Sequence, residues 1–182
     1  YLLSTADGRS YKNIPRLLQA FESLNPAGVQ LALVGRTSRK ELDLQATAAG
    51  MRAGDRVRFL GFVSDEDLAA LYAGAEAFVF PSLYEGFGIP PLEAMACGCP
   101  VIVAERASLP EVCGEAAVYV DPELSQDIAS GIERVLADGD RRTRLRAAGL
   151  QRAACFSYRK AACEILDVLQ RYAGRPVAGP VS

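Results

Sequence analysis

At 182 residues, half of them hydrophobic and 23% charged, the chain is long enough to bury one substantial core, which excludes a disordered protein. The formal net charge of -2 excludes the overall basic field that attracts a protein to nucleic acid or anionic lipid, so any phosphate must be held by a local site. The chain has no histidine, which excludes a histidine general base, a histidine-based triad and a histidine-rich zinc site.

The sequence has no pattern typical of membrane insertion or secretion. No window holds the roughly 18 consecutive apolar residues that a spanning helix needs, and the first residues lack the basic, apolar and small-residue order of a signal peptide. We therefore expect a cytoplasmic protein. Because the chain begins at Tyr1 inside an apolar run, we also expect an N-terminal part of the protein to precede this sequence.

Five cysteines stand in apolar surroundings, are odd in number and form no CxxC pair. These features favour buried, reduced thiols over disulfides or a metal site. The residues concerned are Cys97, Cys99, Cys113, Cys155 and Cys163.

Six short apolar runs alternate with segments of helical period, which is the pattern of βαβ units around a parallel sheet. Several runs are apolar on both faces, as strands are when helices cover both sides of the sheet. We expect strands at residues 1–5, 30–35, 57–61, 77–81, 101–104 and 117–120. The predicted fold class is therefore α/β, a Rossmann-like parallel sheet with helices on both faces.

Helix signals lie between these runs. Asn13 can cap a helix whose apolar stripe covers residues 17–24, with a proline in its first turn. Ser64 and the acidic residues after it start a second helix, which we expect to end at Gly74, and a third begins near Pro90. Three consecutive helices are expected after the last strand, at residues 125–136, 140–155 and 158–172.

The segment of residues 81–100, PSLYEGFGIPPLEAMACGCP, carries the chemistry. It follows an expected strand and enters a helix, so it lies at the carboxyl end of a parallel strand, where open α/β sheets bind ligands. Gly86 and Gly88 lack Cβ atoms and allow a ligand to approach the backbone closely. The amides of Phe87, Gly88 and Ile89 would point at that ligand near a helix N-terminus, an arrangement suited to phosphate.

Two glutamates and two cations complete the candidate site. Glu93 falls about one turn into the helix, where its carboxylate oxygens could accept both hydroxyls of a ribose. Glu85 precedes the turn and would face the sugar end of the same ligand. Because two carboxylates would repel a diphosphate, we expect Arg9 and Lys12, in the loop after the first strand, to bind its phosphates. The alternative is an ordinary strand-to-helix turn with a surface Glu85, a helix-start Glu93 and solvated cations, and the spacing of the two glutamates does not by itself decide between the two interpretations.

Residues 80–101, FPSLYEGFGIPPLEAMACGCPV, resemble the E-x7-E signature of GT4-type glycosyltransferases. Further segments resemble the same family in the same order over nearly the whole chain. They are Lys12-Asn13 with the helix after it, VRFLGFV with DLAALY at residues 57–72, and LPEV at residues 109–112 with Gly114 and Asp121-Pro122. Two positions depart from the family pattern: Arg9 has an unusual spacing, which leaves Lys12 as the firmer assignment, and Ser108 stands where a glycine is common.

The resemblance implies the C-terminal half of a GT-B enzyme. Residues 1–173 would form the domain that binds the nucleotide sugar, residues 174–182 a flexible tail, and the acceptor domain would lie in N-terminal sequence absent here. The implied reaction is transfer of a hexosyl residue, in our interpretation mannosyl, from GDP-mannose or a UDP-sugar to a glycan or lipid-linked acceptor. The resemblance further implies retention of configuration, no required metal or other cofactor, and no activity of this domain without its N-terminal partner.

The resemblance also assigns roles to single residues. Glu93 would bind the ribose and Glu85 the donor sugar, while Arg9 and Lys12 would offset the charge of the departing diphosphate. The backbone of Phe62 and Val63 would meet the base. The other donor-binding positions are Gly35, Arg36, Gly86, Phe87, Gly88, Ile89 and Leu92.

Residues 158–172 carry an apolar stripe at helical spacing, which we expect to pack on the core of the same domain. The stripe consists of Ala162, Ile165, Leu166, Leu169 and Tyr172. The alternative, drawn from the resemblance, is a helix that crosses to the partner domain and leaves part of the stripe exposed in this chain.

Two other functions stay open at this stage. The chain could be a nucleotide-sugar-binding module without catalysis, or a GT-B enzyme of another class, such as an epimerase or a phosphorylase. The second class generally uses histidines or a cofactor lysine motif, neither of which is present. No nucleic-acid partner is expected, and the full-length enzyme could associate peripherally with the inner face of the membrane.

Overall fold

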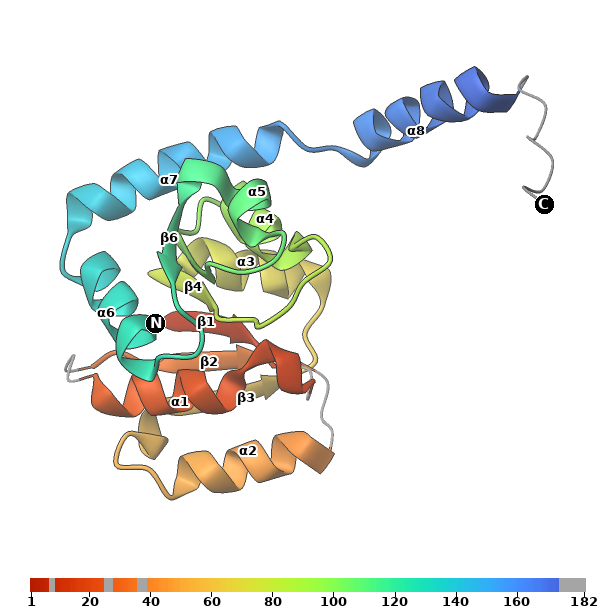
Figure 1. Ribbon diagram of the computed structural model, residues 1–182. Helices are drawn as coiled ribbons and strands as arrows, with labels where there is room; N and C mark the ends of the chain where they lie inside the picture. The colour runs from red at the N-terminus through yellow and green to blue at the C-terminus, as the bar shows by residue number, and fades with distance from the viewer. Residues whose placement is uncertain (7–8, 25–27, 36–38, 174–182) are drawn as a thin grey trace.

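The computed structural model describes residues 1–6, 9–24, 28–35 and 39–173. Six strands form one parallel sheet in the order β3-β2-β1-β4-β5-β6 (Figure 1). The strands are β1 (Leu2–Thr5), β2 (Leu31–Val34), β3 (Val57–Gly61), β4 (Ala77–Phe80), β5 (Val101–Ala104) and β6 (Ala117–Val120). Every strand lies inside one of the six expected runs, and the predicted fold class is confirmed.

The order of the strands reverses at β1, which pairs with β2 on one side and with β4 on the other. Leu2 is level with both Leu31 and Ala77, so the two neighbouring strands start at the same height. At such a reversal the loops after the two central strands leave toward opposite faces and open a crevice at the carboxyl edge. The fold therefore places the loops after β1 and β4 on either side of one crevice.

Helices cover both faces of the sheet. One core layer joins α1 (Ile14–Ser23), α2 (Arg39–Ala49) and α6 (Ser125–Leu136) to the sheet. The other joins α3 (Asp65–Gly74), α4 (Ile89–Ala96) and α5 (Leu109–Cys113), with α7 (Gly139–Ala154) packed along α4. Two helices were not predicted. α2 places only Ala48 in the core among its described side chains, and α5 is little more than one turn.

Two predicted helix starts have different outcomes. Ser64 caps α3 as predicted, because its Oγ accepts a hydrogen bond from the amide of Asp67 at 3.1 Å. Asn13 is the N-cap residue of α1 as predicted, but its side chain forms no capping hydrogen bond. The Asn13 amide group instead donates to the carbonyl oxygens of Pro81 at 3.1 Å and Pro122 at 2.7 Å. These two bonds tie the ends of β4 and β6 to the start of α1. The Asn13 backbone is left-handed, with φ of 58°, a conformation that asparagine tolerates.

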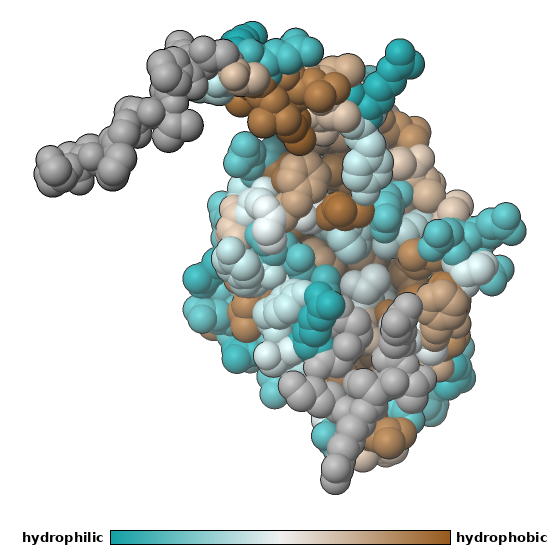
Figure 2. All heavy atoms as spheres, turned by 90° about the vertical axis from the view of Figure 1, so that its right-hand side faces the viewer, coloured by the Kyte–Doolittle hydropathy of each residue, from teal (hydrophilic) through white to brown (hydrophobic). Residues whose placement is uncertain are grey.

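The last helix, α8 (Tyr158–Ala173), extends away from the body of the protein in Figure 1. None of its residues is buried, and Ile165 and Leu169 are 60% and 59% exposed; Figure 2 shows hydrophobic side chains gathered at the top of the molecule, where α8 projects. The prediction that its apolar stripe packs on the core of the same domain is therefore wrong for the structure described. The physical reason is that α7 already covers α4, and the chain turns outward after it. No helix of the described segments is long and apolar enough to cross a membrane.

The five cysteines are free thiols, as predicted, but their burial differs. Cys99 and Cys113 are buried and Cys97 is partly buried, whereas Cys155 and Cys163 are exposed. The prediction of burial is wrong for the last two because they lie at the end of α7 and on the projecting α8.

Thiol reactivity should follow this division. Burial raises the pKa of Cys99 to about 12 and that of Cys113 to about 11, so their reactive thiolate forms are scarce near neutral pH. In the native chain we expect two thiols to react rapidly with a chromogenic disulfide at pH 8, and all five after unfolding. A chain with Cys155→Ser and Cys163→Ser should lose the rapid phase, and a rapid phase that survived both changes would contradict the described burial.

Candidate active site

Two loops meet at the crevice of the sheet. The segment after β1 ends in a short 3-10 turn (Ser10–Lys12), and the segment after β4 runs through residues 81–88. The amide of Leu83 donates to the carbonyl oxygen of Tyr11 at 2.8 Å. The hydroxyl of Ser82, which is fully buried, lies 3.1 Å from the same oxygen. The two loops are thus joined by their backbones before any charged group is considered.

A buried ion pair links the same loops. The Lys12 Nζ lies 2.9 Å from Glu85 Oε1, and the two side chains are only 8% and 13% exposed. Lys12 Nζ also lies 4.4 Å from the centre of the Phe80 ring, where a cation is attracted by the ring face. Ser82 donates a hydrogen bond of 2.8 Å to the same Glu85 oxygen. Glu85 is therefore held from two sides in a place with little water, where charge interactions are strong.

Ser108 holds the Glu85 turn from a third side. It precedes α5, and its Oγ lies 3.0 Å from the carbonyl oxygen of Glu85 and 2.9 Å from that of Phe87. A glycine at this position could form neither contact. From the sequence, Ser108 was identified only as a departure from the family pattern, and Ser82 was not identified at all. Nothing in the local sequence indicates which distant backbone atoms a serine hydroxyl will reach.

The turn leads directly into α4. Gly88 is the N-cap residue with φ of 105°, and a Cβ atom there would lie 2.7 Å from Leu109 Cδ2. Only glycine fits without displacing Leu109, so the fold itself requires Gly88. A Cβ atom at Gly86 would meet nothing within 4 Å, and Gly86 is exposed. The two prolines occupy the first turn of α4, as predicted, and leave the amides of residues 87–89 at its N-terminus.

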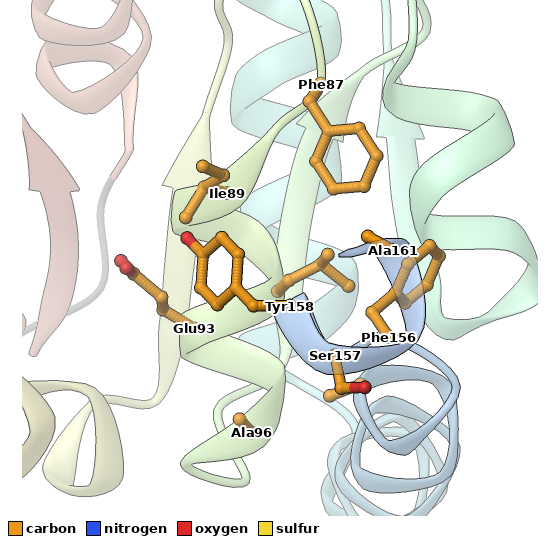
Figure 3. Close-up of a pocket in the computed structure, with 10 residues that line it drawn as sticks. Phe87, Ile89, Glu93, Ala96, Phe156, Ser157, Tyr158 and Ala161 are labelled. Carbon is orange, nitrogen blue, oxygen red and sulfur yellow. The ribbon is translucent and has the colours of Figure 1, made fainter. Parts of the chain in front are cut away.

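Glu93 lies on the exposed face of α4, one turn into the helix as predicted. It borders a cavity of about 520 Å³, between α4 and the junction of α7 with α8, whose walls are mostly apolar. Figure 3 shows its carboxylate pointing away from the Phe87 and Phe156 rings, which meet edge to face with centroids 5.8 Å apart. The lining residues are Phe87, Ile89, Leu92, Glu93, Ala96, Ala153, Phe156, Ser157, Tyr158 and Ala161.

The electrostatic surroundings of Glu93 differ from those of Glu85. Partial burial raises the pKa of Glu93, and the carboxylate of Asp65 raises it further, whereas the hydroxyl of Tyr72 lowers it. Among the described residues, Lys12 forms its ion pair with Glu85 and not with Glu93. The structure therefore brings Lys12 and Glu85 into contact. Glu93 lies one turn into α4, after the loop that carries Glu85.

The remaining predicted residues lie around the same edge of the sheet. Gly35 follows β2, and its amide donates to the carbonyl oxygen of Gly61 at 3.0 Å. Phe62, 72% exposed, and the partly buried Val63 follow β3 at this edge. Arg9 is exposed and donates to the Tyr11 hydroxyl at 2.7 Å, next to the Lys12 pair.

Two features remain, the position of Arg36 and groups that could hold a metal ion. Arg36, expected to line the donor cleft, lies outside the described residues. Within the described ranges, no group of three or more cysteine, aspartate or glutamate side chains is placed to hold a metal ion.

A family model described as glycosyl transferases group 1 matches residues 1–152. The chain belongs to this family. The group 1 domain is 41% identical over 160 residues to O-antigen chain mannosyltransferase B of Escherichia coli, and the match covers 86% of this chain and 42% of that protein. It is 34% identical over 172 residues to an MMP alpha-(1->4)-mannosyltransferase of Mycolicibacterium hassiacum, covering 92% and 42%. The chain thus spans well under half the length of these relatives.

Solved structures agree with this assignment. The group 1 domain matches sucrose-phosphate synthase of Thermosynechococcus elongatus with a TM-score of 0.86 and 29% identity, over 96% of this chain and 46% of that one. It matches Anabaena HepE, solved in complex with UDP and glucose, with a TM-score of 0.81 and 25% identity, over 94% and 48%. The predicted family and GT-B type of fold are confirmed.

Proposed function

We propose that this group 1 domain binds the donor in a retaining hexosyltransferase. The enzyme would transfer a mannosyl residue from a nucleotide-diphosphate sugar to a glycan or lipid-linked acceptor. Membership of the glycosyltransferase family supports the reaction class, and relatives named as mannosyltransferases support the sugar. The observation that carries the proposal is the buried contact of Lys12 with Glu85 in the crevice between β1 and β4, where sheets of this order bind nucleotides.

The diphosphate is assigned to the N-terminus of α4. Lys12 and the amides of Phe87, Gly88 and Ile89 would face its oxygens, and both the cation and the helix end favour negative charge. These groups are held in place by the fold before the bond to the sugar breaks, so they can stabilise the departing diphosphate without reorganising. Arg9 is assigned a secondary part, because its contact with Tyr11 holds it beside the pair.

The hexosyl group and the nucleoside of the donor are assigned to opposite sides of the diphosphate. Glu85 would contact the hexosyl group, since Ser82 and Ser108 hold the turn that carries it. Glu93 would accept the ribose hydroxyls with its two carboxylate oxygens, one turn into α4. Phe62 and Val63, after β3, would meet the base, with Gly35 and Leu92 along the cleft.

Calorimetric titration tests the assignment of the nucleotide. We expect the chain to bind one of GDP, UDP and ADP with higher affinity than the other two. Among the sugar conjugates, we expect GDP-mannose to have the highest affinity. Glu93→Ala should weaken the preferred nucleotide about 100-fold, because two hydrogen bonds to a charged group are lost, each worth about 1.5 kcal/mol or more. A matched control is Glu133→Ala, on the exposed face of α6, which should bind as the parent chain does.

The outcomes separate the alternatives. Equal affinity for every nucleotide in all three proteins would end the proposal, while a preference for UDP would replace GDP-mannose by a UDP-sugar, the kind of donor found with HepE. A longer protein that binds the donor but transfers nothing would support the non-catalytic module. The proposal places the reaction in the cytoplasm, at the inner face of the membrane where the acceptor is lipid-linked, and assigns the exposed α8 stripe to contact with the rest of the enzyme.

A further inference from the structure

Tyr72 has a buried hydroxyl group that the fold does not use. The residue lies on α3, is only 1% exposed, and its ring packs edge to face against Phe78 with centroids 5.1 Å apart. Its hydroxyl has no hydrogen-bond partner among the residues that the structure describes. Because an unpaired buried hydroxyl costs free energy, and phenylalanine would fill the same space without that cost, the hydroxyl calls for an explanation.

Glu93 is the charged group with the strongest influence on this hydroxyl. α3 packs against α4, which carries Glu93. Burial raises the pKa of Tyr72, and the Glu93 carboxylate raises it further, with smaller contributions from Cys99 and Cys97. In return, the Tyr72 hydroxyl lowers the pKa of Glu93, opposing burial and the carboxylate of Asp65. The hydroxyl and the carboxylate are therefore near enough to interact across the packed α3 and α4, and the hydroxyl favours the charged form of Glu93, although the two groups are not within hydrogen-bond geometry.

We propose that Tyr72 is a positioning residue for the nucleotide: when the ribose binds, its hydroxyl donates a hydrogen bond to Glu93 and fixes the carboxylate in the orientation that accepts the ribose hydroxyls. This inference rests on the proposed function and specifies what orients the Glu93 carboxylate. A carboxylate has about four lone-pair sites, so one bond from Tyr72 leaves room for two from the ribose. A flexible glutamate on an exposed helix face loses rotamer freedom on binding, and a fixed donor behind it reduces that loss.

The test is a double-mutant cycle with Tyr72→Phe and Glu93→Ala in this chain, read by calorimetry with GDP and UDP. Tyr72→Phe should melt at the parent temperature or above, and should weaken the preferred nucleotide about tenfold, the lower end of the effect of one hydrogen bond to a charged group. In the Glu93→Ala background the same change should have no effect on affinity. The ratio of affinities for the nucleotide and its 2′-deoxy form should fall in Tyr72→Phe, which a purely structural role would not cause.

Tyr119→Phe is the matched control. Its hydroxyl donates to the carbonyl oxygen of Gly114, so this change should lower stability and leave nucleotide affinity unaltered. An unchanged affinity in Tyr72→Phe, an equal loss with and without Glu93, or a markedly lower melting temperature would each overturn the inference. If Glu93→Ala binds as the parent does, the proposed ribose site fails as well, whereas a weakened Glu93→Ala with a silent Tyr72→Phe removes only the role of Tyr72.

Discussion

Replacement of Glu85 by alanine in the full-length enzyme is expected to lower turnover at least about 100-fold, as loss of one fixed group at a reacting centre commonly does, while donor affinity changes only a few-fold. Glu85 is assigned to the hexosyl group, whereas most of the binding contacts belong to the diphosphate and ribose. Its removal also leaves Lys12 free to serve the diphosphate, which favours affinity. Steady-state kcat and KM with GDP-mannose, together with calorimetry, would separate the two effects.

Two further variants sharpen this experiment. Glu85→Gln keeps an acceptor for Ser82 and Lys12 and loses only the charge, so a turnover as low as that of alanine would identify the charge as the required property. Glu105→Ala, an exposed glutamate at the same edge of the sheet after β5, should leave turnover intact. Unchanged turnover in Glu85→Ala would remove Glu85 from the reaction.

Lys12→Ala is expected to reduce affinity for the preferred nucleoside diphosphate about 100-fold, and to lower the free energy of unfolding by about 3 kcal/mol. The first effect follows from losing the cation assigned to the diphosphate. The second follows from burial, because Glu85, 13% exposed, would be left with an uncompensated charge. Calorimetry would measure the first effect and urea denaturation the second.

Because these two effects could be confused, a double variant is needed. Lys12→Ala with Glu85→Ala removes both charges, so it should regain much of the lost stability while the affinity stays low. Lys160→Ala, an exposed lysine on α8, controls for the loss of positive charge and should behave as the parent chain. Recovery of nucleotide affinity along with stability in the double variant would reduce Lys12 to a structural role.

Much of the local structure could be predicted from residue patterns. Strands such as β4 and β5 are apolar on both faces, a property that only a sheet covered on both sides produces. Ser64 marked the start of α3, and the glycines and prolines before Glu93 marked the turn into α4. Where a local pattern is weak, prediction failed: α2 contributes little to the core, and α5 is too short to show a period.

Apart from α2 and α5, the sequence by itself determined the element types, and it also determined the family and the spacing of Glu85 and Glu93, because these depend on neighbouring residues and on helical or extended periodicity. Tertiary structure alone decided that Lys12 meets Glu85 across 73 positions, that Ser108 reaches back to the Glu85 turn, and that the Asn13 side chain binds Pro81 and Pro122 rather than an amide of α1. It also decided that the apolar stripe of α8 stays exposed. Periodicity shows that a face is apolar or that a side chain is polar, whereas the order of strands in the sheet determines which distant atoms come within reach.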